Sequence, residues 1–567
     1  MRPLLVLTHR LDIPAARQLS AQLPEAQRVV VCPHLADRCL AEDLPVTLLR
    51  TPGDPVQPAY AEARQLARAL QRRADAVLAE VEPLAPGADW LQQELFYLCY
   101  TALGYRALWR NVLRHRDEVP RWHVPVAELP FRYGAHSCLP ALALLEQLAA
   151  LGRPMQAYSH PLAPPEADPL PRLDAAEAAG DWALLSHLPT CFYDVAHFEQ
   201  ALAEHGQASG ERCLNLRAPH YDVDIRRLPS TPLAALDEVR AGLPPAQLER
   251  IDRASAALEA AMLPALEPLM ASARYRLPQA RALAEGWRRL LVFSAALGRR
   301  FDARPPRTLV LSNHDTGLHG PLLTLARRHQ ARVVLLPHSK IFNAPVPAVP
   351  GVALHCLTHA VQGGALHDVA GRQVPRHTLA FPEPLGWSAR PPRPLRTLGV
   401  LLSGVSYNGL CGADLLRFVQ GLRQLRDWAA ERGVACRLRC KPSEPLVALL
   451  TEDLGVDADA LLADMGGSLS DFVQACDLCL SYDVPTSASV ELLRSGVPTL
   501  HVQLRPLLPE ETALVDGALV PRLPLAELLP RLDLYQADAC HLWCFGRDQF
   551  QAFARAWATA EPLANLL

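Results

Sequence analysis

The sequence predicts an α/β protein made of two domains with parallel sheets, and three observations lead to that prediction. The chain has 567 residues, more than one ordinary hydrophobic core organises. Short apolar segments alternate with helical segments along most of the chain, as in sheets whose strands are joined by helices. Five prolines between Pro382 and Pro394 separate two such patterns and indicate a linker.

These patterns divide the chain into four predicted regions. Residues 1–380 form a first α/β domain with helical insertions, and 381–395 form the linker. Residues 396–535 form a second α/β domain, and 536–567 form a C-terminal helix rich in aromatic side chains. Within the first domain, a predicted helix over 90–114 carries an aromatic stripe, which is more typical of a core than of a ligand platform. Its members are Phe96, Tyr97, Tyr100, Tyr105 and Trp109.

The composition excludes several classes of protein. Lys plus Arg is 56 and Asp plus Glu is 59, a near balance that argues against a nucleic-acid partner. The 14 cysteines include one C-x-x-C, Cys476 to Cys479, without a second pair at zinc-finger distance, so no structural zinc is expected. Buried thiols of this kind are typical of a reducing compartment.

The sequence also predicts a cytoplasmic location. The first residues read as a strand rather than as a signal peptide, and no run approaches the ~18 apolar residues of a spanning helix. The abundance of Pro, Ala, Leu and Arg is typical of a GC-rich bacterial genome. We therefore expect at most peripheral membrane association, at the inner face of the inner membrane.

In the second domain, two loops follow predicted strands and carry groups that suit a phosphate. Open α/β sheets bind ligands at such strand ends. The first loop, after the strand 397–402, offers Ser403, Gly404 and Ser406, where glycine lets the backbone approach an anion. The second, after the strand 435–440, offers Lys441 and Ser443. Each could equally be an ordinary turn or a solvated surface lysine.

The third loop of the second domain is the strongest candidate. It follows the predicted strand 478–481, precedes a helix and contains four polar candidates. Hydroxyls here could donate to a phosphate, and a carboxylate could accept from sugar hydroxyls. The alternative is simple helix capping. The four residues are Thr486, Ser487, Ser489 and Glu491.

The layout and these loops resemble the GT-B glycosyltransferases, whose two Rossmann-like domains face each other across a cleft and whose C-terminal helix crosses back. Lys441-Pro442 and the Ser/Thr–Glu loop resemble bacterial capsule and lipopolysaccharide transferases that use CMP-linked Kdo or sialic-acid-type sugars. Ser443-Glu444-Pro445 stands where those enzymes have His-Pro, which leaves the nucleotide base open. The resemblance implies a nucleotide-sugar co-substrate, with no separate cofactor and no metal.

Two strand-end residues of the first domain are candidates for the chemistry. Asp315 follows the predicted strand 308–311, and His338 follows the strand 332–336. A carboxylate could deprotonate an acceptor hydroxyl or attack an anomeric carbon, and a histidine could assist the leaving group. If the two strands are adjacent and parallel, their loops leave in the same direction. The alternatives are that Asp315 caps the next helix and that His338 is a polar strand-end residue.

Further polar residues could contact the substrate. The polar segment from Arg217 to Asp224 could bind an acceptor sugar or form a loop that contains salt bridges. The five substrate-contact candidates are His9, Arg10, His314, Lys340 and Glu383.

The function expected from these features is transfer of a sugar, an acidic one from a CMP donor, onto a bacterial surface glycan or glycoprotein. Two alternatives stay open, namely a nucleotide-sugar 2-epimerase-like enzyme on the same fold and a non-catalytic scaffold of polysaccharide assembly. Retention or inversion at the anomeric carbon is also open, because Asp315 serves either outcome.

Overall fold

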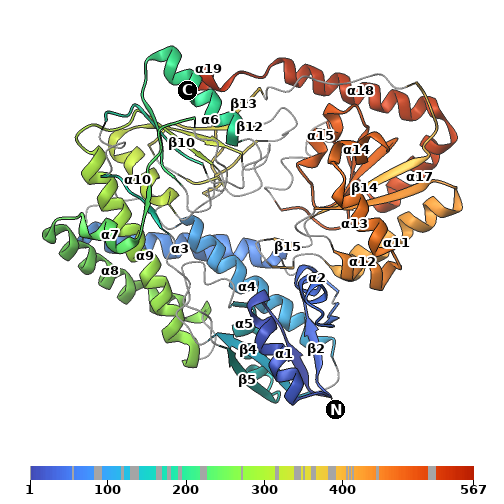
Figure 1. Ribbon diagram of the computed structural model, residues 1–567, viewed down its shortest axis with the longest axis horizontal. Helices are drawn as coiled ribbons and strands as arrows, with labels where there is room; N and C mark the ends of the chain where they lie inside the picture. Colours follow the sequence, from blue (N-terminus) through green and yellow to red (C-terminus); the bar gives the residue numbers. More distant parts are fainter. Residues whose placement is uncertain are drawn as a thin grey trace.

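The computed structural model contains three parallel β-sheets with helices packed on and between them (Figure 1). The structure describes residues 2–50, 52–53, 56–81, 92–116, 120–127, 139–160, 169–174, 180–188, 195–217, 227–269, 273–312, 318–337, 346–348, 351–358, 365–368, 370–380, 391–403, 406–407, 410–411, 414–441, 446–508 and 519–567.

The N-terminal sheet has the strand order β3-β2-β1-β4-β5, and neighbouring strands are parallel. Helices α1, α2 and α5 connect or cover these strands (Figure 1). Their bounds are β1 Leu4–Val6, α1 Ile13–Gln22, β2 Gln27–Val30, α2 Pro33–Ala41, β3 Thr47–Leu48, β4 Trp122–Ala127, α5 Leu139–Ala150 and β5 Met155–His160.

The central sheet has the order β13-β12-β11-β10-β7-β8 and is also parallel throughout. Its bounds are β7 Leu184–His187, α6 Val195–Ser209, β8 Cys213–Asn215, β10 Thr308–Ser312, α10 His319–His329, β11 Arg332–Leu336, β12 Leu354–Thr358 and β13 Arg376–Thr378. A small antiparallel pair lies outside this sheet, β6 Leu170–Pro171 with β9 Leu233–Ala234.

The C-terminal sheet has the parallel order β17-β14-β18-β19-β20. A short antiparallel hairpin, β15 Ser406–Tyr407 with β16 Leu410–Cys411, follows β14. The other bounds are β14 Thr397–Ser403, α11 Leu415–Glu431, β17 Ala435–Cys440, α12 Val447–Leu454, α13 Ala458–Gly466, α14 Leu469–Gln474, β18 Leu478–Asp483, α15 Ala488–Arg494, β19 Thr499–Gln503, β20 Arg522–Pro524 and α17 Leu525–Ala537.

Long helices lie between the N-terminal and central sheets (Figure 1). The predicted aromatic stripe lies on one of them, and Phe96, Tyr100 and Trp109 are buried in the core. Phe96 and Tyr100 stack with ring centroids 5.7 Å apart, so this stripe is a packing surface. The long helices are α3 Val56–Val81, α4 Gln92–Arg114, α8 Pro245–Leu266 and α9 Ala273–Phe301, and the short helix α7 Leu236–Ala241 packs on α9.

The predicted α/β class with Rossmann-like parallel sheets is confirmed, and residues 1–380 contain two such sheets rather than one. Strands β4, β8, β12 and β13 and helix α2 were not predicted. Pro125 lies within β4, and proline cannot donate a hydrogen bond to the ladder. β4 pairs with β1 only at Trp122 and His123, so Pro125 lies beyond that pairing and is in register with Tyr158 of β5.

The N-terminal sheet is attached to the C-terminal sheet through α2 and α12. Asp37 of α2 is buried and accepts a hydrogen bond of 2.7 Å from the backbone N–H of Ala448, in the first turn of α12. Arg50, just after β3, pairs with Asp453 at 2.7 Å and with Glu452 at 2.9 Å. A helix of one domain therefore has its N-terminal amides satisfied by a carboxylate of another.

The end of the chain crosses from the C-terminal sheet to the central sheet, as predicted. Helix α18 (Ala539–Ala558) runs along the upper side of the molecule, and α19 (Leu563–Leu566) ends beside α6 (Figure 1). The Glu561 N–H donates to the Thr378 carbonyl at 2.9 Å, and the Ala380 N–H donates to the Glu561 carbonyl at 2.8 Å. The residues between α18 and α19 thus extend the edge of the central sheet beyond β13.

Both members of the predicted C-x-x-C are buried in the C-terminal domain. A Cβ atom added at Gly399 of β14 would lie 2.7 Å from the Cys476 sulfur and 2.8 Å from the Cys479 sulfur. The two thiols therefore fill space against a backbone that lacks a side chain.

In the part of the chain that the structure describes, no helix combines the length and the apolar character needed to cross a bilayer.

We expect the crossing segment to depend on one buried leucine. Leu563 of α19 is 2% exposed in the core of the central sheet. Leu563→Ala should lower the free energy of unfolding by roughly 2–5 kcal/mol, since it opens a cavity there. Leu534→Ala on α17 is the matched control, because Leu534 is 42% exposed. Equal urea midpoints for the two variants would contradict a stabilising role for this contact.

Candidate functional site

The C-terminal sheet reverses its winding direction at β14. The chain passes from β14 to β17 on one side and then crosses to β18 on the other. Ligands of open α/β sheets bind at the carboxyl ends of the strands at such a reversal. Ser403, the last residue of β14, lies opposite Asp483, the last residue of β18, and Leu402 lies opposite Cys440 of β17. The three loops predicted from the sequence therefore leave from one edge of one sheet.

A buried ion pair organises this edge. Asp483 has a left-handed backbone with φ of 62°, a conformation that aspartate tolerates better than most residues. Its Oδ2 lies 3.6 Å from Nε of Arg505, and the two side chains are only 3% and 6% exposed. Arg505 comes from the segment after β19, and its Nη1 donates to the Pro506 carbonyl at 3.1 Å. The ends of β18 and β19 are thereby held together.

Ser481 of β18 fixes the loop that follows it. Its hydroxyl donates to the Val484 carbonyl at 3.4 Å and accepts from the Thr486 N–H at 3.3 Å. Nδ1 of His501, on the adjacent strand β19, lies 3.4 Å from the same oxygen. His501 is completely buried, and this burial lowers its pKa to about 3. The neutral His501 and the Ser481 hydroxyl thus hold the loop that follows β18.

The loop and the first turn of α15 contain the predicted phosphate and ribose contacts. Thr486 Oγ1 accepts from the Ala488 N–H at 3.3 Å, so the predicted alternative, local capping, occurs at this residue. Ser487 is half-buried and makes no capping hydrogen bond. Glu491 is half-buried, and its Oε2 accepts from Arg494 Nη1 at 2.9 Å. Ser487 and Glu491 therefore offer partly exposed polar groups beside the β14–β18 reversal.

Ser489 lies differently from its predicted partners. Its side chain is completely buried, and its hydroxyl has no hydrogen-bond partner among the described residues. Ser489 is therefore buried in the first turn of α15, whereas Ser487 is only half-buried.

The other two predicted loops are only partly described. Lys441 is exposed directly after β17. Ser403 and Ser406 belong to β14 and β15 by their backbones. Gly404 and Ser443 lie outside the described residues. The register nevertheless brings the ends of β14 and β17 together, as the loop prediction requires.

In the central sheet, the two strands that precede the predicted chemical groups are neighbours. β10 and β11 pair in parallel, with Ser312 opposite Leu336. The condition set for the two loops, that their strands are adjacent and parallel, is therefore met. Asp315 and His338, which those loops contain, lie outside the described residues. The same holds for the predicted substrate contacts His314, Lys340 and Glu383 and for His220, Asp222 and Asp224.

Two buried histidines at this edge were missed by the sequence reading. His187 ends β7, where the central sheet reverses its winding direction between β7 and β10. Its Nδ1 lies 2.7 Å from the Leu216 carbonyl. His319 begins α10, directly after the loop that carries Asp315, and the two histidine rings meet edge to face with centroids 6.2 Å apart. The sequence signal for His187 was its place as a polar residue near the end of the predicted strand 182–188.

His9 and Arg10 lie at the carboxyl end of β1 in the N-terminal sheet. Buried Asp12 accepts from the Thr8 N–H at 2.7 Å, the Thr8 hydroxyl at 3.0 Å and the His9 N–H at 2.9 Å. His9 Nδ1 in turn accepts from the Leu11 N–H at 3.2 Å. His9 therefore caps a local turn, and Arg10 is exposed beside it.

Within the described ranges, no group of three or more His, Cys, Asp and Glu side chains is arranged to hold a metal ion.

Comparison with known proteins gives remote similarity alone. No family description matches the chain, and no curated protein matches it. Among solved structures, Acinetobacter baumannii MurG has 13% identity and a TM-score of 0.35, over 68% of this chain and 97% of its own. The glycosyltransferase SnogD from Streptomyces nogalater has 12% identity and a TM-score of 0.32, over 68% and 97%.

A third similar structure is assigned as a UDP-N-acetylglucosamine 2-epimerase from Listeria monocytogenes. It has 10% identity and a TM-score of 0.30, over 66% of this chain and 95% of its own. With TM-scores this low, the matches add nothing to what the three sheets themselves show about the fold.

Burial of His501 predicts an acid-sensitive C-terminal domain. Its pKa is lowered to about 3 in the fold from an ordinary value of 6.5, so the unfolded chain takes up the proton first as pH falls. Its contribution to stability is complete above pH 6.5 and is lost as pH falls from 6.5 toward 3. Urea unfolding at pH 7 and pH 4.5 should show a smaller loss for His501→Gln than for the wild type.

His541→Gln is the control for this measurement, because His541 is exposed on α18. Its loss of stability between the two pH values should equal that of the wild type. If His501→Gln also retains the full loss, His501 does not control the acid response.

Proposed function

We propose that the protein is a glycosyltransferase that binds a nucleotide-sugar donor at the carboxyl edge of the C-terminal sheet. The observation that carries the proposal is the β14–β18 reversal, where Ser403 lies opposite Asp483 and the loop to Ser487 begins. This is the position at which open parallel sheets bind nucleotides. The GT-B-like arrangement, with a C-terminal helix that returns to another sheet, supports the same class of enzyme.

The donor nucleotide is held in this proposal by three kinds of group. The Ser487 hydroxyl donates to a phosphate oxygen, and exposed Lys441 supplies a positive charge near it. Glu491 accepts from the ribose hydroxyls and exchanges its bond with Arg494 for them. Thr486 shapes the loop through its contact with Ala488. The remaining predicted contacts, Ser403, Gly404, Ser406 and Ser443, belong to the two adjoining loops.

Ser489 has a supporting role in the proposed site. Its hydroxyl is buried beneath the loop, so it reaches a phosphate only if the loop shifts. We therefore assign direct contact to Ser487 and packing to Ser489.

We propose that the central sheet supplies the reacting groups. Asp315 acts as general base toward the acceptor hydroxyl, or as nucleophile in a retaining mechanism, and His338 assists the departing phosphate. Support comes from the parallel pairing of β10 with β11, which sends both loops out of one edge. His187 and His319 lie at the base of that edge. Positive groups and hydroxyl donors stabilise the charge on the leaving phosphate.

The donor we propose is a CMP-linked acidic sugar of the Kdo or nonulosonate type. The support is the Lys441-Pro442 pair together with the Ser487–Glu491 loop. The acceptor is a surface glycan or glycoprotein, and transfer takes place in the cytoplasm or at the inner face of the membrane. The substrate candidates His314, Lys340 and Glu383 would contact the sugar or the acceptor.

Donor binding can be measured without knowing the acceptor. Melting temperature should rise with CMP more than with CDP, UDP or GDP, because a ligand of the native state stabilises it by mass action. Ser487→Ala should weaken nucleotide binding about tenfold, since a hydrogen bond to a charged phosphate is lost. Ser495→Ala, at the other end of α15, should leave the affinity unchanged. A protein that no nucleotide stabilises would instead fit the scaffold alternative.

The reacting group is tested by Asp315→Ala. Sugar transfer should fall by roughly 100-fold or more, the effect of removing a general base, while CMP binding stays at the wild-type level. Turnover can be followed by release of the nucleotide and by a glycan product on a gel. Normal transfer by this variant would remove Asp315 from the mechanism. Consumption of nucleotide sugar without a glycan product would favour the 2-epimerase alternative.

A further inference from the structure

A cavity lies away from the proposed donor site, in the helical layer of α8 and α9. Its volume is about 380 Å³. Its walls come from α8, α9 and α10, together with Asp302, which directly follows α9. In Figure 1, α8 and α9 lie on the opposite side of the molecule from β14 and α15. The cavity is therefore separate from the β14–β18 reversal.

The charges around this cavity are mostly positive. Three arginines line it, Arg250, Arg299 and Arg328, and Asp302 is the one carboxylate among its lining residues. Asp302 accepts from Arg328 Nη1 at 3.0 and 2.8 Å, and from His329 at 2.7 Å. The Asp302 carboxylate is therefore shared by Arg328 and His329. The lining keeps an excess of positive charge that favours an anionic ligand.

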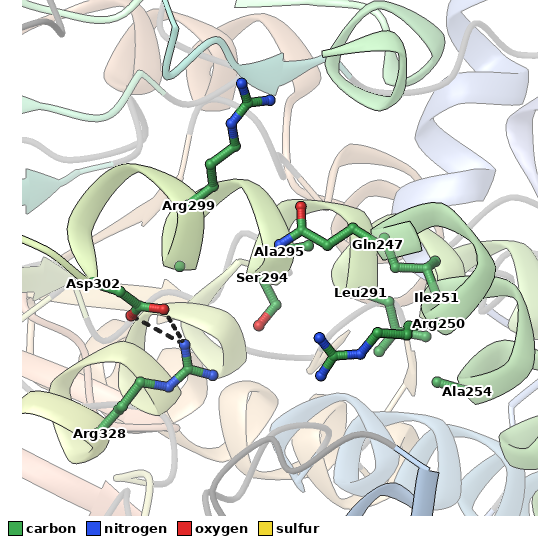
Figure 2. A pocket seen from close by; sticks show the side chains of 11 residues that line it. Gln247, Arg250, Ile251, Ala254, Leu291, Ser294, Ala295, Arg299, Asp302 and Arg328 are labelled. Atoms are coloured by element: carbon green, nitrogen blue, oxygen red, sulfur yellow. Dashed lines mark hydrogen bonds and ion pairs between the residues drawn. The ribbon is translucent and has the colours of Figure 1, made fainter. Parts of the chain in front are cut away.

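Polar groups lie between the two facing arginines. Figure 2 shows Arg250 and Arg328 entering from opposite sides, with the Ser294 hydroxyl between them. Gln247 lies above Arg250, and its Oε1 is buried without a partner among the described residues. Arg299 points away from this group in Figure 2, and its guanidinium donates to the Gly242 carbonyl. Arg250, Ser294 and Arg328 thus form the recognition face.

The remaining wall is apolar and restricts the size of the ligand. Ile251, Ala254 and Leu291 line it beside the polar face, and Ile251 and Ala254 are almost completely buried. A volume of about 380 Å³ is at the lower end of the range for small-molecule sites, roughly 300–1,000 Å³. It accommodates a small anion with a short carbon skeleton.

We propose that this cavity binds a small phosphorylated molecule. Two guanidinium groups and a hydroxyl placed around one space match the several acceptor oxygens of a phosphoryl group. A carboxylate offers only two oxygens and would leave part of this donor set unused. The Gln247 carbonyl oxygen then accepts from a hydroxyl on the carbon skeleton. This proposal is independent of the donor site and of sugar transfer.

The test is calorimetric titration of the full chain with glycerol 3-phosphate, inorganic phosphate and malonate. Glycerol 3-phosphate should bind, inorganic phosphate should bind more weakly, and malonate should bind weakest. Arg250→Ala should weaken binding of glycerol 3-phosphate about tenfold or more, because a charged hydrogen bond is lost. Arg253→Ala is the matched control, since Arg253 is exposed on the same helix and does not line the cavity.

Ser294→Ala is a milder second variant, which removes one hydroxyl and keeps the helix former. It should weaken binding of glycerol 3-phosphate severalfold while leaving the far-ultraviolet circular dichroism unchanged. Equal binding of glycerol 3-phosphate by the wild type and both variants would overturn the proposal. The proposal would also be overturned if neither glycerol 3-phosphate nor inorganic phosphate bound to the wild type. Malonate binding as tight as that of glycerol 3-phosphate would overturn the phosphoryl assignment.

Discussion

The buried pair of Asp483 and Arg505 is the interaction on which the candidate donor site depends. The two side chains are almost completely excluded from water, so breaking this pair by removing one partner would cost roughly 3–5 kcal/mol. The pair joins the end of β18 to the segment after β19. Because Asp483 also takes a left-handed backbone, the chain turns sharply there, and the loop to Ser487 starts in a defined direction beside β14.

The C-terminal sheet is attached to the rest of the molecule on two sides. On one side, Asp37 and Arg50 of the N-terminal domain contact α12 at its first turn and at its end. On the other, the crossing segment adds Glu561 to the edge of the central sheet. Burial raises the pKa of Asp37, and the amides of α12 oppose that effect. These attachments hold the C-terminal sheet in a fixed relation to the N-terminal and central sheets.

The central sheet also reverses its winding direction, between β7 and β10. Parallel pairing of β10 with β11 places the carboxyl ends of the two strands that precede Asp315 and His338 at one edge. The reversal between β7 and β10 adds buried His187, whose ring meets that of His319. The C-terminal and central sheets therefore each reverse their winding direction once, at β14 and between β7 and β10. The cavity beside α8 and α9 belongs to neither reversal.

Local alternation in the sequence was sufficient for the α/β class, the aromatic core helix and the strand-end positions of the loops, because these features depend on neighbouring residues. The crossing of the C-terminal helix was expected from the resemblance to GT-B enzymes. Strand order, and hence the pairing of Ser403 with Asp483, depends on contacts between distant segments. The same is true of the Asp37 cap on α12 and of the space between Arg250 and Arg328. Hydrophobic periodicity specifies which face of an element is buried, but only the packed chain decides which other element covers it. For that reason the third sheet, the His187–His319 pair and the arginine-lined cavity emerged only from the tertiary structure.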